Sequence, residues 1–145
     1  MSSRATSVMA GVVAALSTVT GLAVLRGRPK GSEGNTPPCC WVAAGPLLDQ
    51  HGPDLGGYVQ TLSVELTVFI EASDSAFGTR EDAVLDQMAL IGAALRSANW
   101  ASYRLIEAPI LEQAANLSAS IHGKSEASAY GVLTFRWQIE PTETT

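Results

Sequence analysis

The chain has 145 residues and a formal net charge of −5 at pH 7. Hydrophobic residues make up 46% of it and charged residues 16%, which excludes intrinsic disorder and predicts a globular fold with one ordinary core. The acidic balance argues against a protein that wraps nucleic acid by electrostatic attraction. The two cysteines, Cys39 and Cys40, are adjacent and cannot supply a disulfide framework.

The charges are distributed unevenly along the chain. Residues 1–30 hold four basic residues and no acidic residue, which gives this segment a charge of +4. The other five basic residues and all fourteen acidic residues lie in residues 31–145, which therefore carry −9. A basic segment joined to an acidic body can attract an identical neighbour or another partner through complementary fields.

An uncharged run of 21 residues, 5–25, lies between Arg4 and Arg26. Three interpretations are open: a helix, turn and strand of the folded domain, a cleavable signal peptide with a small-x-small site at 21–23, or a membrane anchor. Serine, threonine and glycine fill a third of the run, and arginine on both sides gives no clear orientation bias. Both facts disfavour the anchor.

The folded interpretation explains the apolar spacing best. Val8, Val12 and Leu16 repeat every four residues, which predicts an amphipathic helix over about residues 3–17. A break rich in threonine follows, and residues 22–25 then predict a short buried strand that ends at a basic residue.

Turn-forming residues dominate the next part of the chain. Residues 27–38 and 45–57 are rich in glycine, proline and polar residues, and we expect two long exposed loops there. The apolar residues 39–43 between them predict a short strand. Loops of this length in a small domain are commonly functional.

Residues 58–71 carry the clearest pattern in the sequence. Apolar and polar residues alternate strictly over most of this range, which predicts a long strand with one covered face and one wetter face. Glu65 and Glu71 fall on the wetter face, and we expect solvated charges there rather than a catalytic pair.

The next element is predicted as a helix over residues 80–96. Thr79 is the expected N-cap, with Asp82 in the capping-box position, and Arg96 suits the last turn. The expected buried stripe consists of Val84, Met88, Ile91 and Leu95.

The C-terminal third predicts two or three further strands. The expected elements are a strand at 103–106, an ambiguous segment at 111–122 that favours a strand, a turn at 123–128, a final strand at 129–139 and a polar tail at 141–145. Long strands joined by loops indicate a mainly antiparallel sheet with two helices packed on one face, an α+β fold. We expect a single domain over residues 1–140.

Motifs that carry catalytic chemistry are absent from the sequence: it has no GxGxxG, P-loop, HExxH, GxSxG or CxxC. His51 and His122 stand alone, and Cys39, Cys40 and His51 lack the spacing of a zinc site. We therefore expect no catalytic, cofactor-binding or metal-ligating residues, no cofactor, and no enzymatic activity.

One basic stretch carries a functional hypothesis. Arg26, Arg28 and Lys30 leave the expected strand at 22–25 and lead into the first loop, with Trp41 nearby. Solvated loop charges are one interpretation. The other is a contact surface for a second copy or a partner, with the tryptophan as its anchor.

The arrangement resembles the tail-terminator (minor tail) proteins of long-tailed bacteriophages. The resemblance covers nearly the whole chain and concerns the layout of its elements, beginning with a short amphipathic helix. It rests on the segments Leu25-Arg26-Gly27-Arg28-Pro29, Trp41-Val42, the strand 58–71, the helix 80–96 and the closing strand 130–140 with its Leu-Thr-Phe-Arg-Trp-Gln-Ile pattern.

The resemblance implies a structural role in the virion. Such proteins form a homohexameric ring at the head-proximal end of the tail, where the ring ends polymerisation of the tail tube and meets the head-completion or connector protein. The implied partners are copies of the chain, the tail tube protein and the connector, with DNA only as passing cargo, no membrane association, and assembly in the host cytoplasm.

Two other functions remain open. One is another head–tail connector or neck ring component of the same kind of particle. The other, from a different class, is a secreted or periplasmic binding domain that loses its N-terminal segment.

Overall fold

The computed structural model describes residues 3–28, 38–51, 57–71, 77–118 and 126–139. Its elements in chain order are helix α1 (Arg4–Leu16), strands β1 (Ala23–Arg26), β2 (Cys39–His51) and β3 (Tyr58–Glu71), helix α2 (Phe77–Ser97), the short 3₁₀-helix η1 (Ala101–Tyr103), and strands β4 (Ile110–Ser118) and β5 (Glu126–Ile139).

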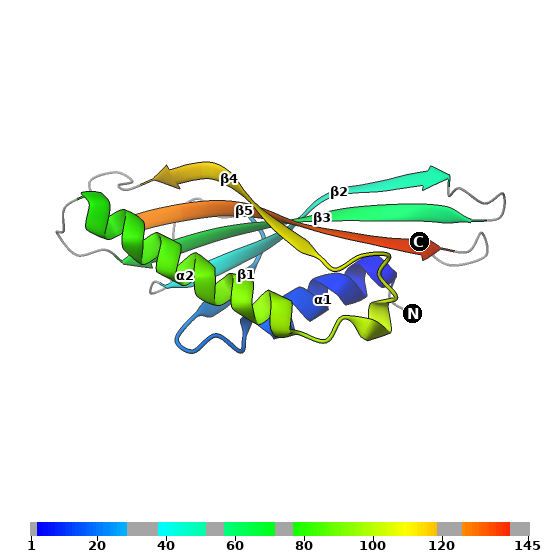
Figure 1. Ribbon diagram of the computed structural model, residues 1–145, viewed down its shortest axis with the longest axis horizontal. Coiled ribbons are helices and arrows are strands. Elements are labelled where there is room, and N and C mark those ends of the chain that lie inside the picture. Colours follow the sequence, from blue (N-terminus) through cyan, green and yellow to red (C-terminus); the bar gives the residue numbers. More distant parts are fainter. Residues whose placement is uncertain (1–2, 29–37, 52–56, 72–76, 119–125, 140–145) are drawn as a thin grey trace.

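The strands form one five-stranded sheet in the order β1-β2-β3-β5-β4. Only the β1–β2 pair is parallel, and the other three pairs are antiparallel. Both α-helices lie on the same side of the sheet (Figure 1), so the opposite face carries no helix among the described residues. The predicted α+β class, with a mainly antiparallel sheet and two helices on one face, is confirmed.

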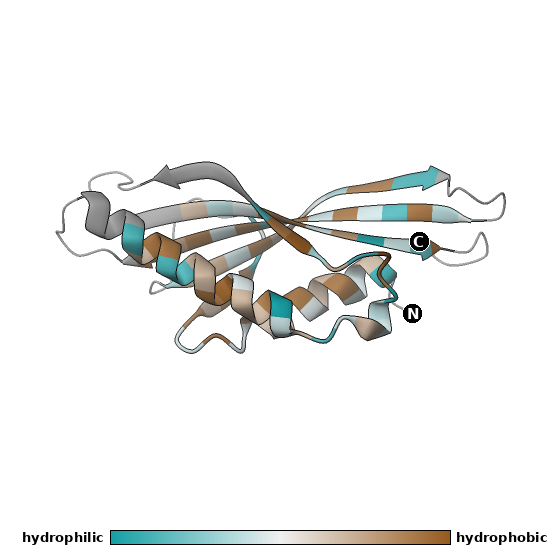
Figure 2. Ribbon diagram, viewed as in Figure 1, coloured by the Kyte–Doolittle hydropathy of each residue, from teal (hydrophilic) through white to brown (hydrophobic). Residues whose placement is uncertain are grey.

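The core lies between the helices and the sheet, and the alternating strands supply most of it. In β3 the side chains from Leu62 to Ile70 at every second position are at most 5% exposed, and in β5 those from Ala129 to Ile139 are likewise buried. Figure 2 shows the resulting alternation of hydropathy along β3. The predicted stripe of α2, which consists of Val84, Met88, Ile91 and Leu95, completes the core and is at most 3% exposed.

Helix α1 is part of this core. Val8, Val12 and Leu16 are fully buried, as their four-residue spacing predicts. The Ser3 side chain accepts a hydrogen bond from the Thr6 N–H at 3.2 Å and caps the first turn. No helix in the described part of the chain is long and apolar enough to cross a membrane.

The structure corrects two expectations in the first half of the chain. Strand β1 lies at the sheet edge with one neighbour, so its ends are exposed rather than buried. Strand β2 continues to His51, where the sequence predicted a loop from residue 45. Its register shifts between Ala44 and Leu47, and Pro46 lies in that irregularity beyond the part of β2 that pairs with β1. Proline is tolerated there because no ladder hydrogen bond is lost.

Two further expectations are wrong at the ends of elements. Helix α2 begins at Phe77, so Thr79 lies inside the helix instead of capping it. A capping preference of about 1 kcal/mol is local and does not prevent a helix from extending. The predicted strand at 103–106 is η1 followed by a turn, and only Leu105 bridges to Trp137 of β5.

Strand β3 spans its predicted range, and β4 confirms the strand interpretation up to Ser118. Strand β5 begins at Glu126, three residues earlier than predicted, so residues 126–128 belong to this strand and not to the turn predicted at 123–128. Most of the loop 27–38, residues 52–56 of the second loop, residues 119–125 and the polar tail at 141–145 lie outside the described residues.

Candidate interaction surface

Three of the four candidate contact residues, Arg26, Arg28 and Trp41, lie at or beside the β1 edge of the sheet. Arg26, the last residue of β1, is exposed and aligned with Val42 of β2. The next residue, Gly27, donates its N–H to the Val42 carbonyl oxygen at 2.9 Å. Its φ of 118° lies in the left-handed region, so the turn requires glycine. A Cβ atom there would lie 3.8 Å from the ring of Trp41, which is ordinary contact.

The turn at Gly27 brings Arg28 across two strands. Arg28 Nη2 donates to the Ala44 carbonyl oxygen at 3.0 Å and pairs with Glu65 Oε2 at 2.8 Å. The side chains are 62% and 22% exposed, so we expect this ion pair to stabilise the fold by less than about 1 kcal/mol. Glu65, expected to be a solvated charge, is therefore paired within its own chain.

The same carboxylate contacts strand β5. A side-chain hydrogen bond joins Glu65 to Tyr130; burial raises the pKa of Tyr130 above its usual value, and so does this hydrogen bond. Gly45 leaves room for the carboxylate, because a Cβ atom at this position would lie 2.9 Å from the Ser63 carbonyl oxygen and 3.1 Å from Glu65 Oε2. We call Arg28, Glu65 and Tyr130 the Arg28 cluster.

Trp41 is half-buried rather than projecting as an exposed anchor. Its Nε1 is a buried polar atom without a hydrogen-bond partner in the part of the chain that the structure describes. The ring lies beneath Gly27 on strand β2, aligned with Thr67 of β3. Lys30, the fourth candidate, lies outside the described residues.

This surface offers charge and hydrogen bonding at a sheet edge. Arg26 is an exposed cation, whereas Arg28 is already engaged by Glu65 and the Ala44 carbonyl oxygen. Sequence reasoning missed Glu65 and Tyr130 as partners, because alternation assigns residues to a face but gives no register between strands. The only indication of this pairing in the sequence was that Glu65 and Tyr130 both fall on the more polar faces of their strands.

The two cysteines are buried hydrophobic residues in this structure. Cys39 and Cys40 are fully buried and make no disulfide. Burial raises the pKa of the Cys40 thiol to about 12, and the neighbouring Cys39 adds to the shift. A thiol with this pKa is almost entirely protonated at neutral pH and therefore a poor nucleophile and metal ligand. The side chains of His51 and His122 lie outside the described residues.

Comparison with solved structures found chains of similar fold. No protein-family model matches the chain, and no curated protein matches its sequence. A chain in a solved particle described as the virion of native gene transfer agent (GTA) is similar in structure, with a TM-score of 0.52 and 18% sequence identity. The match covers 96% of this chain and 100% of that chain. At this identity the match shows a shared fold.

Proposed function

We propose that this chain is a structural protein of a phage-like virion and forms a ring that caps the tail tube. The single observation that carries the proposal is the fold shared with a chain of the gene transfer agent virion over almost the full length of both chains. The layout of segments that resembles tail terminators agrees with it. In this role the ring ends tube polymerisation and presents a surface to the connector, and the protein performs no catalysis.

The surface described above suits assembly between copies. Arg26 is exposed at a sheet edge, and the body of the protein supplies an excess of acidic residues that can attract it. A ring needs contacts in which one surface of a copy meets a different surface of the next copy. A basic edge and an acidic body meet that requirement.

Another ring of the neck is the closest alternative, because it would use the same fold and the same kind of contact. The secreted binding domain is less favoured. Removal of about the first 23 residues would take away α1, whose Val8, Val12 and Leu16 are fully buried in the core. Loss of those residues in intact-mass analysis of the native protein would favour the secreted domain.

The experiment adds the purified protein to polymerising tail tubes and measures tube length by electron microscopy. The proposal predicts tubes that stop growing, with extra density at one end only. Tubes of unchanged length with bare ends would contradict the tail-cap role. Binding to a purified connector without any effect on tubes would favour the alternative neck ring.

A further inference from the structure

The exposed face of α2 is an acidic ridge with apolar side chains. Asp82 and Asp86 are exposed and four residues apart, so they lie on one side of the helix and repel each other. Neither has an ion-pair partner among the described residues. Leu85 and Leu90 beside them are 46% and 56% exposed. We call these four residues the acidic ridge.

Electrostatics within the helix do not explain this pattern. Acidic residues in the first turn of a helix interact favourably with its dipole, but the effect fades beyond that turn. Helix α2 begins at Phe77 and has no acidic residue in its first turn, so the dipole explains neither Asp82 nor Asp86. The dipole also does not explain two leucines that are about half exposed on the same helix.

The opposite end of the helical layer has the complementary character. A shallow hollow of about 340 Å³ lies between η1 and β4, with Trp100, Leu105 and Pro109 among its lining residues. Ile106 in the lining is 49% exposed, and Ile110, which directly follows the last lining residue, is 56% exposed. We call this the basic hollow, because the acidic residue in its lining is paired with an arginine from outside the lining, while the arginine in the lining has no ion-pair partner among the described residues.

The arginine in the lining is Arg104. The other charged residue in the lining, Glu107, pairs with Arg136 at 3.4 Å, whereas Arg104 has no ion-pair partner among the described residues. Arg104 has φ 51° and ψ 50°, the left-handed conformation, which is unfavourable for an arginine. A strained residue at an exposed site is a reason to look for a function.

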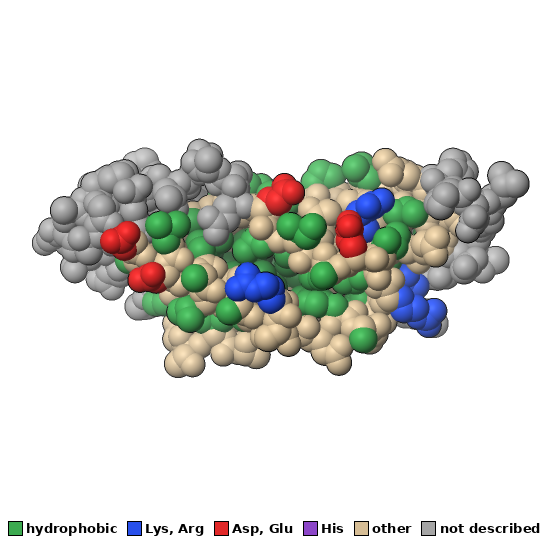
Figure 3. Space-filling view, in the orientation of Figure 1, with side chains coloured by type: hydrophobic (Ala, Val, Ile, Leu, Met, Phe, Trp, Pro, Cys, Tyr) green, Lys and Arg blue, Asp and Glu red, His purple; other side chains and the backbone are tan. Residues whose placement is uncertain are grey.

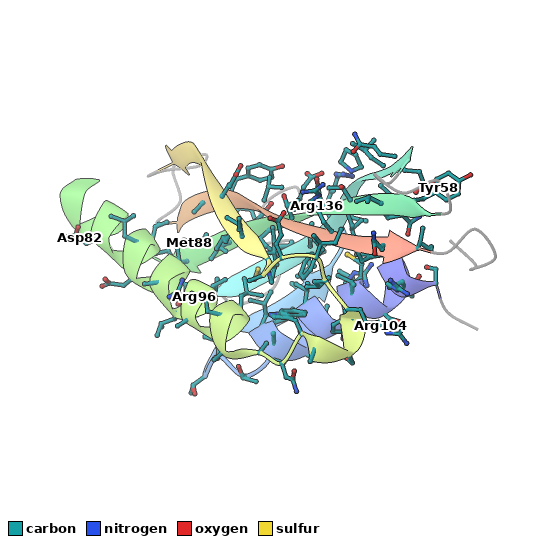
Figure 4. The ribbon with its side chains drawn as sticks, turned by 45° about the vertical axis from the view of Figure 1, so that its right-hand side comes forward. Tyr58, Asp82, Met88, Arg96, Arg104 and Arg136 are labelled. Carbon is teal, nitrogen blue, oxygen red and sulfur yellow. The ribbon has the colours of Figure 1, made fainter. Side chains whose placement is uncertain are left out.

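Ridge and hollow lie far apart in one molecule. Figure 4 shows Asp82 and Arg104 at opposite ends of the helical layer. Figure 3 shows acidic side chains near the end of this face where α2 begins, a basic side chain near its middle, and side chains of both signs toward the other end. From residue 82 to the end of α2 alone the helix rises about 22 Å. The two surfaces therefore cannot satisfy each other within one chain.

We propose that the acidic ridge of one copy of this chain binds the basic hollow of another copy. Leu85 and Leu90 cover the exposed isoleucines and the apolar lining, and Asp82 and Asp86 face Arg104. Because ridge and hollow are different surfaces, the contact repeats from copy to copy, as a ring requires. The inference rests on the proposed function, since it names a further contact between neighbouring copies in the ring, in addition to the one at Arg26.

Charge reversal on each surface tests the pairing. The variants are Asp82→Arg/Asp86→Arg on the ridge and Arg104→Asp in the hollow, where aspartate is among the residues that best tolerate a positive φ. Light scattering measures the mass of the full chain against concentration, with tail tubes present if the wild type needs them. Each variant alone is expected to associate at least about tenfold more weakly than the wild type.

Mixing the ridge variant and the hollow variant in equal amounts tests directly whether the two surfaces bind each other. Each ridge then meets an oppositely charged hollow, so the mixture is expected to recover the mass of the wild-type assembly. Recovery also demonstrates that both variants are folded. Glu112→Arg is the matched control, because Glu112 is exposed on β4 and belongs to neither surface; it is expected to assemble like the wild type.

Three results would overturn the inference in distinguishable ways. Variants that assemble and cap tubes like the wild type would remove the ridge–hollow contact and leave the proposed function standing. Variants that fail singly and also fail when mixed would show that the two surfaces do not pair. A wild-type chain that never assembles, with or without tubes, would remove both proposals.

Discussion

Cys39 and Cys40 illustrate how strand geometry separates adjacent residues. Successive side chains of a strand point to opposite faces of the sheet. Cys40 accordingly belongs to the core between sheet and helices, whereas Cys39 is aligned with Phe69 on the other face. Both are fully buried, so each behaves as a small apolar residue rather than as a reactive thiol.

We expect neither cysteine to react with iodoacetamide at pH 8 in the native protein. The thiolate is the reactive form, and burial raises the pKa of Cys40 to about 12. Intact-mass measurement should detect no adduct in buffer and two adducts in concentrated urea. Rapid labelling of the native chain would contradict the burial of both side chains.

The same shift predicts a pH dependence of stability. The pKa of Cys40 is higher in the folded chain than its ordinary value of 9.0, so the folded state binds the proton more tightly. Its contribution is fully present below pH 9 and decreases as the pH rises towards 12. Urea unfolding at pH 8 and pH 10.5 should give a lower free energy at the higher pH, and Cys40→Ala should reduce the difference.

A hydrogen-bond chain crosses three strands on the helix-facing side of the sheet and runs from the buried Trp137 to the exposed Asp49. Trp137 Nε1 donates to Gln60 Oε1 at 3.0 Å, and Gln60 Nε2 donates to Asp49 Oδ1 at 2.7 Å. Gln60 is 1% exposed and Trp137 is fully buried. Because water cannot replace a lost partner of Trp137 Nε1, the buried Trp137–Gln60 bond matters more to stability than the exposed Arg28–Glu65 pair.

Gln60→Leu should lower the free energy of unfolding by about 1–3 kcal/mol, because Trp137 Nε1 would be left buried without an acceptor. Urea denaturation provides the measurement. The control is Gln138→Leu, a change of the same residue types at an exposed position of β5. Equal stability of the two variants would indicate that the hydrogen bond adds nothing.

At the scale of elements, helix α1 decides how the N-terminal run is interpreted. Leu16→Ala should destabilise the protein by about 2–5 kcal/mol, because Leu16 is fully buried in the core cluster. Ala14→Ser, on the exposed side of the same helix, should cost only about 0.5 kcal/mol. Thermal unfolding measures both, and an unaffected Leu16→Ala variant would mean that α1 is not part of the core.

Elements with long, regular patterns could be predicted from the sequence, and irregular ones could not. The alternation in β3 and the four-residue spacing in α1 specify both element type and buried face. The strand at residues 45–51 was missed because Gly45 and Pro46 signal a turn, whereas the structure absorbs them in a register shift. The Arg28 cluster depends on strand register, which one sequence does not contain.

At the scale of the whole molecule, a substitution of Arg26 tests the role of the β1 edge in assembly more directly than a substitution of Arg28. Arg26→Glu should weaken assembly and leave thermal unfolding unchanged, because Arg26 is exposed and has no ion pair among the described residues. Arg28→Glu would place a second negative charge beside Glu65 and disturb the fold itself. Arg26→Lys, which keeps the charge, is the control and should assemble normally.

The central claim is that this chain assembles into a ring at the end of a tail tube. Its most direct test is the mass of the purified protein in solution, by light scattering across a range of salt concentrations, with and without tail tubes. The account predicts a hexamer, or a monomer that becomes hexameric when tubes are added. A monomer at every concentration that never binds tubes would contradict it.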